Sequence, residues 1–215
     1  MQKKLPKIYH FINEVNLSDL AKLSNNIHII FRNYQRKVNL EEILTLRKFC
    51  KYSKRQVFIS NNIKLALKLK ISGVYIPSFN KKINFASSFS YPKNFNIIGS
   101  AHNFREIEIK KKQGCKEIFL SPIFKVQKRT NYLNLYNFNK LIIDKEIRYV
   151  ALGGINESNY KKIKLTKSNG FAAITWIKKN GLSKLRPFKY FSILNNYNAK
   201  PIAISFTFKL SASVS

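Results

Sequence analysis

Two adjacent glycines, Gly153 and Gly154, end the apolar run VALGG in a chain of 215 residues that has only 7 glycines. A glycine pair directly after an apolar run lets the backbone turn sharply and lets a ligand approach its N–H groups, as phosphate sites require. The pair therefore predicts an anion site. The alternative is that both glycines only form a tight turn before the segment ESNYKKIKL, and the spacing favours neither interpretation.

Polar and basic residues follow other short apolar runs in the same way. Arg32 follows NIHIIF, Ser100 ends FNIIGS, and His102 stands two residues later. Arginine binds phosphate through several N–H donors, and an imidazole titrates near neutral pH, where it can act as an acid or a base. The alternatives are a surface arginine and a histidine that caps or packs beside Asn103. The loop KVQKRTN at 125–131 adds further cations.

The runs that end at these residues are rich in β-branched and aromatic side chains. Eight of them occur along the chain, at 7–12, 26–31, 56–60, 73–77, 95–100, 117–124, 148–154 and 171–177. Between them lie segments with apolar residues at helical spacing, for example 40–53, 62–70 and 103–114. Alternating strands and helices predict a parallel sheet with right-handed crossovers. Eight such units predict an α/β fold, a single (β/α)8 TIM barrel, with functional residues at the carboxyl ends of its strands.

Charge is the most unusual feature of the composition. The net charge of +30 would suit nucleic acid, but the lysines are spread over every segment and no helix-turn-helix, RNA-binding or zinc pattern accompanies them. A solvated surface is therefore favoured over a nucleic-acid face. The same positive field would attract a phosphorylated small substrate.

Compartment and redox state follow from simpler features. No apolar run approaches 18 residues, and the segment MQKKLPKIYHFINEV lacks the apolar core of a signal peptide, so we expect a cytoplasmic protein without a membrane segment. Cys50 and Cys115 have neither paired nor metal-type spacing, and we expect both to be reduced packing residues.

Four segments in this order and spacing, GVYIPSFN, GSAHNFREIEIKKKQGCKEIFLSPIFKVQKRTN, VALGGINESN and GFAAITWI, resemble the thiamine phosphate synthase/TenI family. The resemblance covers roughly residues 27 to 180 and implies a TIM barrel, in agreement with the strand count. Synthases of this family join hydroxymethylpyrimidine diphosphate to a thiazole phosphate and expel pyrophosphate. The resemblance therefore implies a site that stabilises a pyrimidine cation and a departing diphosphate.

The resemblance also assigns roles at the diphosphate end of such a site. Arg32 and Arg129 match basic residues that hold the diphosphate, and Ser100 matches a serine that contacts the pyrimidine and the diphosphate. His102 matches the acid/base histidine of the tautomerases in the family, although synthases often carry a histidine there too.

At the other end, the thiazole phosphate would lie on Gly153, Gly154 and the N–H groups around Thr175, with Lys128 as a further phosphate-binding cation.

The chain departs from the family pattern where the family binds magnesium. Asn61 and Asn80 stand in place of two aspartates, and an amide is a weaker ligand than a carboxylate for Mg²⁺. Tyr34 stands where a lysine is expected. If Mg²⁺ binds weakly, cations near the leaving diphosphate would have to supply the missing charge, and the candidates are Arg36, Lys37, Lys128 and Arg129.

Three hypotheses follow. The first is a divergent thiamine phosphate synthase, the second a metal-independent TenI-like thiazole tautomerase or a phosphate-binding relative without turnover, and the third, most remote, a basic nucleic-acid-binding protein. In each case the barrel is expected to span residues 1–196, with a C-terminal extension at 197–215 and a homo-oligomer as an open alternative.

Overall fold

The computed structural model describes residues 6–34, 39–85, 90–127 and 130–180. In these ranges eight parallel strands form a closed barrel in chain order. They are β1 (Lys7–Ile12), β2 (Ile27–Phe31), β3 (Val57–Ser60), β4 (Gly73–Ile76), β5 (Asn96–Ala101), β6 (Glu117–Leu120), β7 (Arg148–Leu152) and β8 (Gly170–Ala173). The predicted (β/α)8 fold is therefore confirmed. The predicted boundary at 196 and the extension at 197–215 lie outside the described residues.

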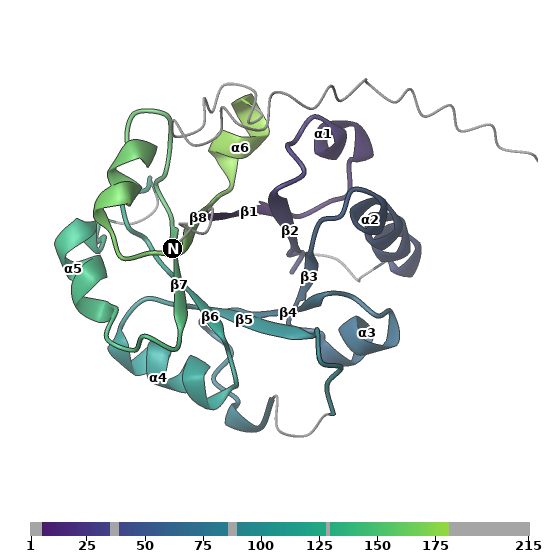
Figure 1. Ribbon diagram of the computed structural model, residues 1–215, viewed down its shortest axis with the longest axis horizontal. Helices are drawn as coiled ribbons and strands as arrows, with labels where there is room; N and C mark the ends of the chain where they lie inside the picture. The colour runs from purple at the N-terminus through teal and green to yellow at the C-terminus, as the bar shows by residue number, and fades with distance from the viewer. Residues whose placement is uncertain (1–5, 35–38, 86–89, 128–129, 181–215) are drawn as a thin grey trace, which may run out of the picture. The chain divides into compact units, whose positions relative to one another are not determined.

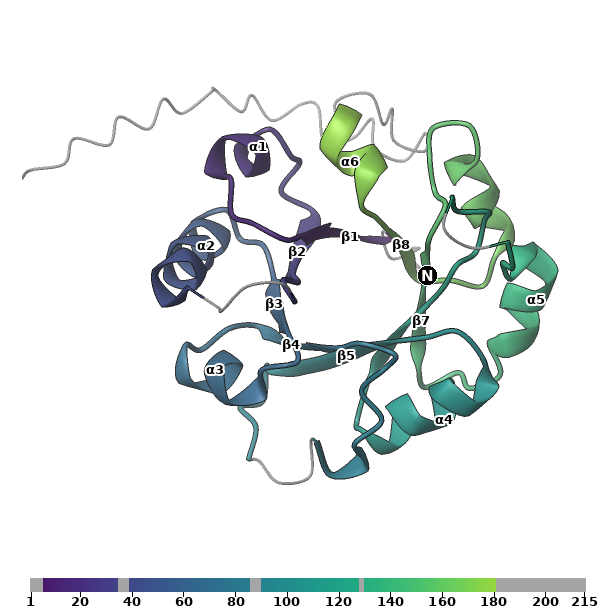
Figure 2. The same cartoon turned by 180° about the vertical axis from the view of Figure 1, so that it is seen from behind.

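Helices lie outside the ring of strands, as Figure 1 and the reverse view in Figure 2 show. They are α1 (Leu17–Ala21), α2 (Leu40–Tyr52), α3 (Ile63–Lys68), α4 (Phe104–Lys112), α5 (Asn134–Leu141) and α6 (Thr175–Asn180). Asparagine side chains cap the first four helices by accepting a backbone N–H of the first turn. Short 3-10 helices at Ile83–Phe85 and Tyr160–Leu165 follow β4 and β7. No helix in the described ranges is long and apolar enough to cross a membrane.

The barrel closes because β1 pairs on one side with β2 and on the other with β8. In the pairing of β1 with β8, Lys7 lies opposite Gly170 and Tyr9 lies opposite Ala172. Because all neighbouring strands run parallel, every carboxyl end lies at one end of the barrel and every amino end at the other. Residues that are far apart in the sequence thus reach a common site.

Aromatic side chains fill the barrel interior. The ring of Phe119 in β6 contacts those of Tyr9, Phe11 and Tyr75 edge-on, with centroids 4.9, 5.9 and 6.0 Å away. All four side chains are buried. Edge-to-face contacts of this kind favour one packing arrangement over others, so the interior is a packed core rather than a channel.

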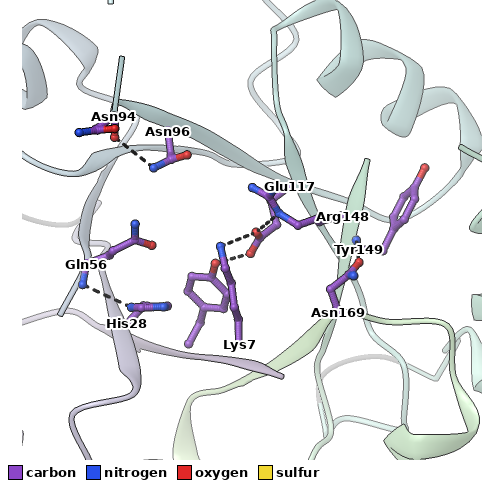
Figure 3. A network of polar contacts seen from close by, with 10 residues as sticks. Lys7, His28, Gln56, Asn94, Asn96, Glu117, Arg148, Tyr149 and Asn169 are labelled. Atoms are coloured by element: carbon purple, nitrogen blue, oxygen red, sulfur yellow. Dashed lines mark hydrogen bonds and ion pairs between the residues drawn. The ribbon is translucent and has the colours of Figure 1, made fainter. Parts of the chain in front are cut away.

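A buried carboxylate joins three strands at the amino-terminal end of the barrel. Glu117, the first residue of β6, is 1% exposed and accepts hydrogen bonds from Lys7 Nζ at 3.1 Å, from Arg148 Nε at 3.0 Å and from the Tyr9 hydroxyl. Figure 3 shows Lys7 and Arg148 reaching this carboxylate from two other strands. Only the carboxylate is buried, because the side chains of Lys7 and Arg148 are 36% and 44% exposed. The Glu117 cluster, which consists of these four residues, therefore ties β1, β6 and β7 together.

The two cysteines are free and buried. Burial raises the pKa of each thiol to about 12, so neither Cys50 nor Cys115 carries a reactive thiolate near neutral pH. This confirms the prediction that both are reduced packing residues.

His28 in β2 lies beside the Glu117 cluster, with its ring centroid 5.3 Å from that of Tyr9. Its Nδ1 accepts the backbone N–H of Gln56 at 3.3 Å, so this nitrogen carries no proton. Burial, and next the positive charge of Lys7, lower the pKa of His28 from 6.5 to about 4. The folded protein therefore keeps this imidazole neutral in mildly acidic solution.

This environment predicts acid-labile stability. As the pH falls from 6.5 to about 4, the unfolded chain protonates His28 and the folded chain does not, so the free energy of unfolding decreases. At 1.4 kcal/mol per pKa unit the loss approaches about 3 kcal/mol. His28→Asn keeps an acceptor for Gln56 without a titrating group, and its unfolding free energy in urea should depend less on pH across this window. Parallel pH profiles of the wild type and the variant would contradict the assignment.

Candidate functional site

The structure gathers the predicted site residues that it describes at the carboxyl-terminal end of the barrel. Arg32, Asn61 and His102 directly follow β2, β3 and β5, Ser100 lies near the end of β5, and Asn80 belongs to the loop after β4. Gly153 and Gly154 follow β7, and Thr175 begins α6 after β8. The other candidate cations, Arg36, Lys37, Lys128 and Arg129, lie outside the described residues.

Thr175 differs from expectation in its local structure. The run 171–177 was predicted as one strand, but β8 ends at Ala173 and Thr175 is the exposed first residue of α6. Trp176 and Ile177 belong to this helix, and their side chains are buried. This explains why the apolar run extends beyond the strand. The backbone N–H groups around Thr175 therefore belong to a helix start.

Hydrogen bonds fix the orientation and tautomer of His102. Its Nδ1 lies 2.6 Å from the carbonyl oxygen of Ser121, which can only accept, so Nδ1 carries the proton. Nε2 lies 3.1 Å from the Ser78 hydroxyl, and in the neutral imidazole it accepts the proton of this hydroxyl. Asn103, rather than His102, caps α4. The imidazole is thus held across the ends of β4, β5 and β6.

A cavity of about 920 Å³ lies beside this histidine. His102, Ser121 and Pro122 line it together with the loop residues 125–127 and 130–133. Lys125 supplies a positive charge, and Tyr132, 46% exposed, supplies an aromatic face. The sequence indicated the basic loop but gave no signal for Tyr132, because a tyrosine in a loop has no characteristic spacing.

The glycine pair is explained by close packing of two loops. Gly153 and Gly154 have φ of +93° and +71°, a region that side chains disfavour. A Cβ on Gly153 would lie 2.8 Å from Pro122, and one on Gly154 would lie 2.6 Å from the carbonyl oxygens of Phe124 and Lys125. The Phe124 N–H also donates to the Gly153 carbonyl at 3.2 Å. The pair thus lets the loop after β6, which lines the cavity, pack directly on the end of β7.

Arg32 is held by aromatic rings. Its guanidinium lies 5.1 Å from the ring centroid of Phe11 and 6.0 Å from that of Tyr34. Phe11 in turn contacts Tyr75, whose hydroxyl donates to the buried Ser100 Oγ at 2.8 Å. Cation–π contacts keep such a guanidinium in place without neutralising its charge. A chain of contacts therefore connects Arg32 with Ser100.

Tyr34 and Phe79 form an exposed aromatic pair that sequence reasoning did not find. Their rings meet edge-on at 5.5 Å, and the Tyr34 hydroxyl lies 2.9 Å from Ser60 Oγ. The side chains are 51% and 62% exposed. Tyr34 thus links the ends of β2, β3 and β4 at the position where the family resemblance implies a lysine. The only signal in the sequence is that both aromatic residues follow strand ends.

Asn61 and Asn80, although 19 positions apart, are brought together as an amide pair. Asn80 Nδ2 donates to Asn61 Oδ1 at 2.5 Å, and Asn80 Oδ1 accepts the backbone N–H of Lys82 at 3.1 Å. Both side-chain oxygens are thus engaged by N–H donors. The described residues contain no cluster of three or more His, Cys, Asp or Glu side chains that could hold a metal. The amide pair therefore does not fit Mg²⁺, which favours carboxylates.

A closed parallel barrel with basic and hydrogen-bonding groups at the carboxyl ends of its strands defines a TIM barrel of the type whose sites handle small, often phosphorylated molecules. A family model described as thiamine monophosphate synthase matches residues 21–177. The chain belongs to this family, the thiamine monophosphate synthase/TenI family.

Individual relatives agree with this family. A thiamine-phosphate synthase of Prochlorococcus marinus is 31% identical over 128 residues, which are 58% of this chain and 36% of the relative. One of a Hydrogenobaculum species is 25% identical over 155 residues, 68% of this chain and 69% of the relative. The chain thus spans little more than a third of the Prochlorococcus protein.

Among solved structures, a thiamine phosphate pyrophosphorylase from Pyrococcus furiosus superposes with a TM-score of 0.65 at 20% identity. The match covers 80% of this chain and 87% of that one. At this identity the likeness establishes the fold alone.

The packing around the glycine pair predicts the effect of a single methyl group. Gly154→Ala should lower the free energy of unfolding by about 2–4 kcal/mol, because it combines a left-handed φ with backbone crowding. Gly114→Ala is the matched control, since Gly114 also has positive φ, +77°, but is exposed after α4. Chemical denaturation of both variants measures the difference. Equal destabilisation of the two would show that the loop contact adds nothing.

Proposed function

We propose that the chain is a divergent thiamine phosphate synthase, which condenses hydroxymethylpyrimidine diphosphate with thiazole phosphate to give thiamine phosphate and pyrophosphate. The observation that carries the proposal is the family match over residues 21–177, because it includes the ends of seven of the eight strands. The clustering of Arg32, Ser100, His102 and the glycine pair at one end of the barrel supports it. The +30 net charge is also suited to two phosphorylated substrates.

In the proposed reaction, the bond between the pyrimidine methylene carbon and the diphosphate oxygen breaks, and the diphosphate leaves with the bonding electrons. The thiazole nitrogen then attacks the methylene carbon of the pyrimidine cation. Arg32 would bind the departing diphosphate, and its position over the Phe11 ring fixes its charge before the reaction begins. Ser100 Oγ, which already accepts from Tyr75, would donate its own proton to the pyrimidine or the diphosphate. Arg129 is proposed as a second cation on sequence grounds.

The thiazole phosphate would lie at the other side of the site. The proposed contacts are the backbone N–H groups of Gly153 and Gly154 and those around Thr175. Lys128 is proposed as a further phosphate-binding cation on sequence grounds. Close packing of the loop after β6 on the glycine pair would keep this backbone rigid, so that little conformational entropy is lost when the phosphate binds.

A second candidate is metal-independent proton transfer on a thiazole phosphate, as in TenI-like tautomerases. The geometry of His102 favours it, because its Nε2 is an acceptor beside the cavity and its Nδ1–H is held by a carbonyl. An imidazole oriented in this way can accept a proton from a substrate and return it to another atom. Product analysis distinguishes the two functions, since only the synthase joins two substrates.

Arg32 provides the test of the proposed synthase. With both substrates present, the wild type should form thiamine phosphate, measured by the fluorescence of its oxidised product, and Arg32→Gln should reduce the rate about 100-fold because it removes a fixed charge from the leaving group. Arg47→Gln in α2 is the matched control and should retain the wild-type rate. Absence of product in the wild type, or equal rates in the two variants, would contradict the proposal.

A further inference from the structure

Lys110 in α4 places a buried positive charge beneath the loop that follows β4. Its side chain is 0% exposed, and Nζ donates at 2.8 Å to each of three neutral oxygens, the carbonyls of Pro77 and Asn80 and the side chain of Gln113. Burial lowers the pKa of Lys110 to about 8, an effect that Cys115 and then Glu106 partly offset. Three acceptors at this distance match the three N–H donors of an ammonium group.

The fold has room for this lysine because β5 carries a glycine beside it. A Cβ on Gly99 would lie 2.8 Å from Lys110 Cδ and 2.9 Å from Cys115 Sγ. Any larger residue at position 99 would displace the lysine stem. The Lys110 side chain is therefore part of the packing of α4 on the barrel.

Gln113 completes the arrangement. It is also 0% exposed, and its Nε2 donates to the carbonyls of Asn80 at 2.9 Å and Lys82 at 3.0 Å. The carbonyl of Asn80 thus accepts from both side chains. We call Lys110 and Gln113 the Lys110 clamp, because together they fasten the backbone of 77–82 to α4.

The clamp determines how Asn80 presents its side chain. Lys110 and Gln113 hold the backbone carbonyl of Asn80. The side-chain amide of Asn80 donates to Asn61 and accepts from the backbone N–H of Lys82. A divalent cation at this pair would have to displace these donors and would face the ammonium that holds Asn80. Like charges in a partly buried setting repel strongly, whereas an anion is attracted by the same field.

We propose that the Lys110 clamp takes the place of a divalent cation at this end of the barrel, so that a diphosphate binds here without Mg²⁺. This inference rests on the proposed function, since it concerns the same diphosphate. The clamp positions the loop and supplies a fixed charge, and the amide pair forms a neutral bridge between the ends of β3 and β4.

The test uses pyrophosphate and Mn²⁺ as probes and needs no turnover. In the presence of a chelator the wild type should bind pyrophosphate in a calorimetric titration, and without chelator it should leave the electron paramagnetic resonance signal of added Mn²⁺ unchanged. The double variant Asn61→Asp/Asn80→Asp, which changes exposed or half-buried side chains, should take up Mn²⁺. Its affinity for pyrophosphate in chelator should fall about tenfold or more, because two negative charges are added.

Lys110→Met and Lys111→Met form a matched pair, since each removes one charge from adjacent positions. Lys111 pairs at the surface with Glu108 and Asp144, so its replacement should change pyrophosphate affinity less than about twofold, against about tenfold for Lys110→Met. If Lys110→Met does not fold, Mn²⁺ uptake and pyrophosphate affinity of the Asn61→Asp/Asn80→Asp variant test the inference.

Uptake of Mn²⁺ by the wild type, pyrophosphate binding only with a metal, or no pyrophosphate binding would overturn the inference. Metal-free pyrophosphate binding without any thiamine phosphate formation would support it and contradict the proposed function.

Discussion

Closure of eight parallel strands is the constraint on which the site depends. The candidate groups lie at the ends of several strands, and Ser100 and His102 share the end of β5. They come to one end of the molecule because the barrel closes, with β1 paired to both β2 and β8. The Glu117 cluster supports closure at the amino-terminal end, where one carboxylate joins β1, β6 and β7. The aromatic core around Phe119 fills the space between that cluster and the site. The Glu117 cluster and the candidate site thus lie at opposite ends of the same barrel.

Charge is used differently at the two ends. At the amino-terminal end, Lys7 and Arg148 both form ion pairs with the carboxylate of Glu117. At the carboxyl-terminal end, Arg32 is held by aromatic rings and Lys110 by neutral oxygens, so both retain their charge. In the part of the chain that the structure describes, neither cation forms an ion pair, and a fixed positive charge of this kind suits an anionic ligand. This contrast, more than the total charge of the chain, indicates where a phosphorylated substrate would bind.

The sequence was sufficient to predict the barrel, because β-branched runs alternate with helical segments eight times and the observed strands lie within or next to the predicted runs. Strand ends then predicted which residues lie at the site, and Asn61 and Asn80 do meet there. Thr175 was assigned to a strand because Trp176 and Ile177 continue the apolar run, although they are buried from a helix. The Lys110 clamp was not predictable, because Lys110 stands in a run of three lysines and only the tertiary packing at Gly99 distinguishes it.

In the proposed function, this barrel performs synthase chemistry with charges supplied by its own side chains. The most direct measurement is the rate of thiamine phosphate formation by the wild type, from hydroxymethylpyrimidine diphosphate and thiazole phosphate, after exhaustive removal of metal and in the presence of a chelator. Without metal, product should form at a rate close to that measured with Mg²⁺ present. Product that forms only when Mg²⁺ is restored, or no product under either condition, would contradict it.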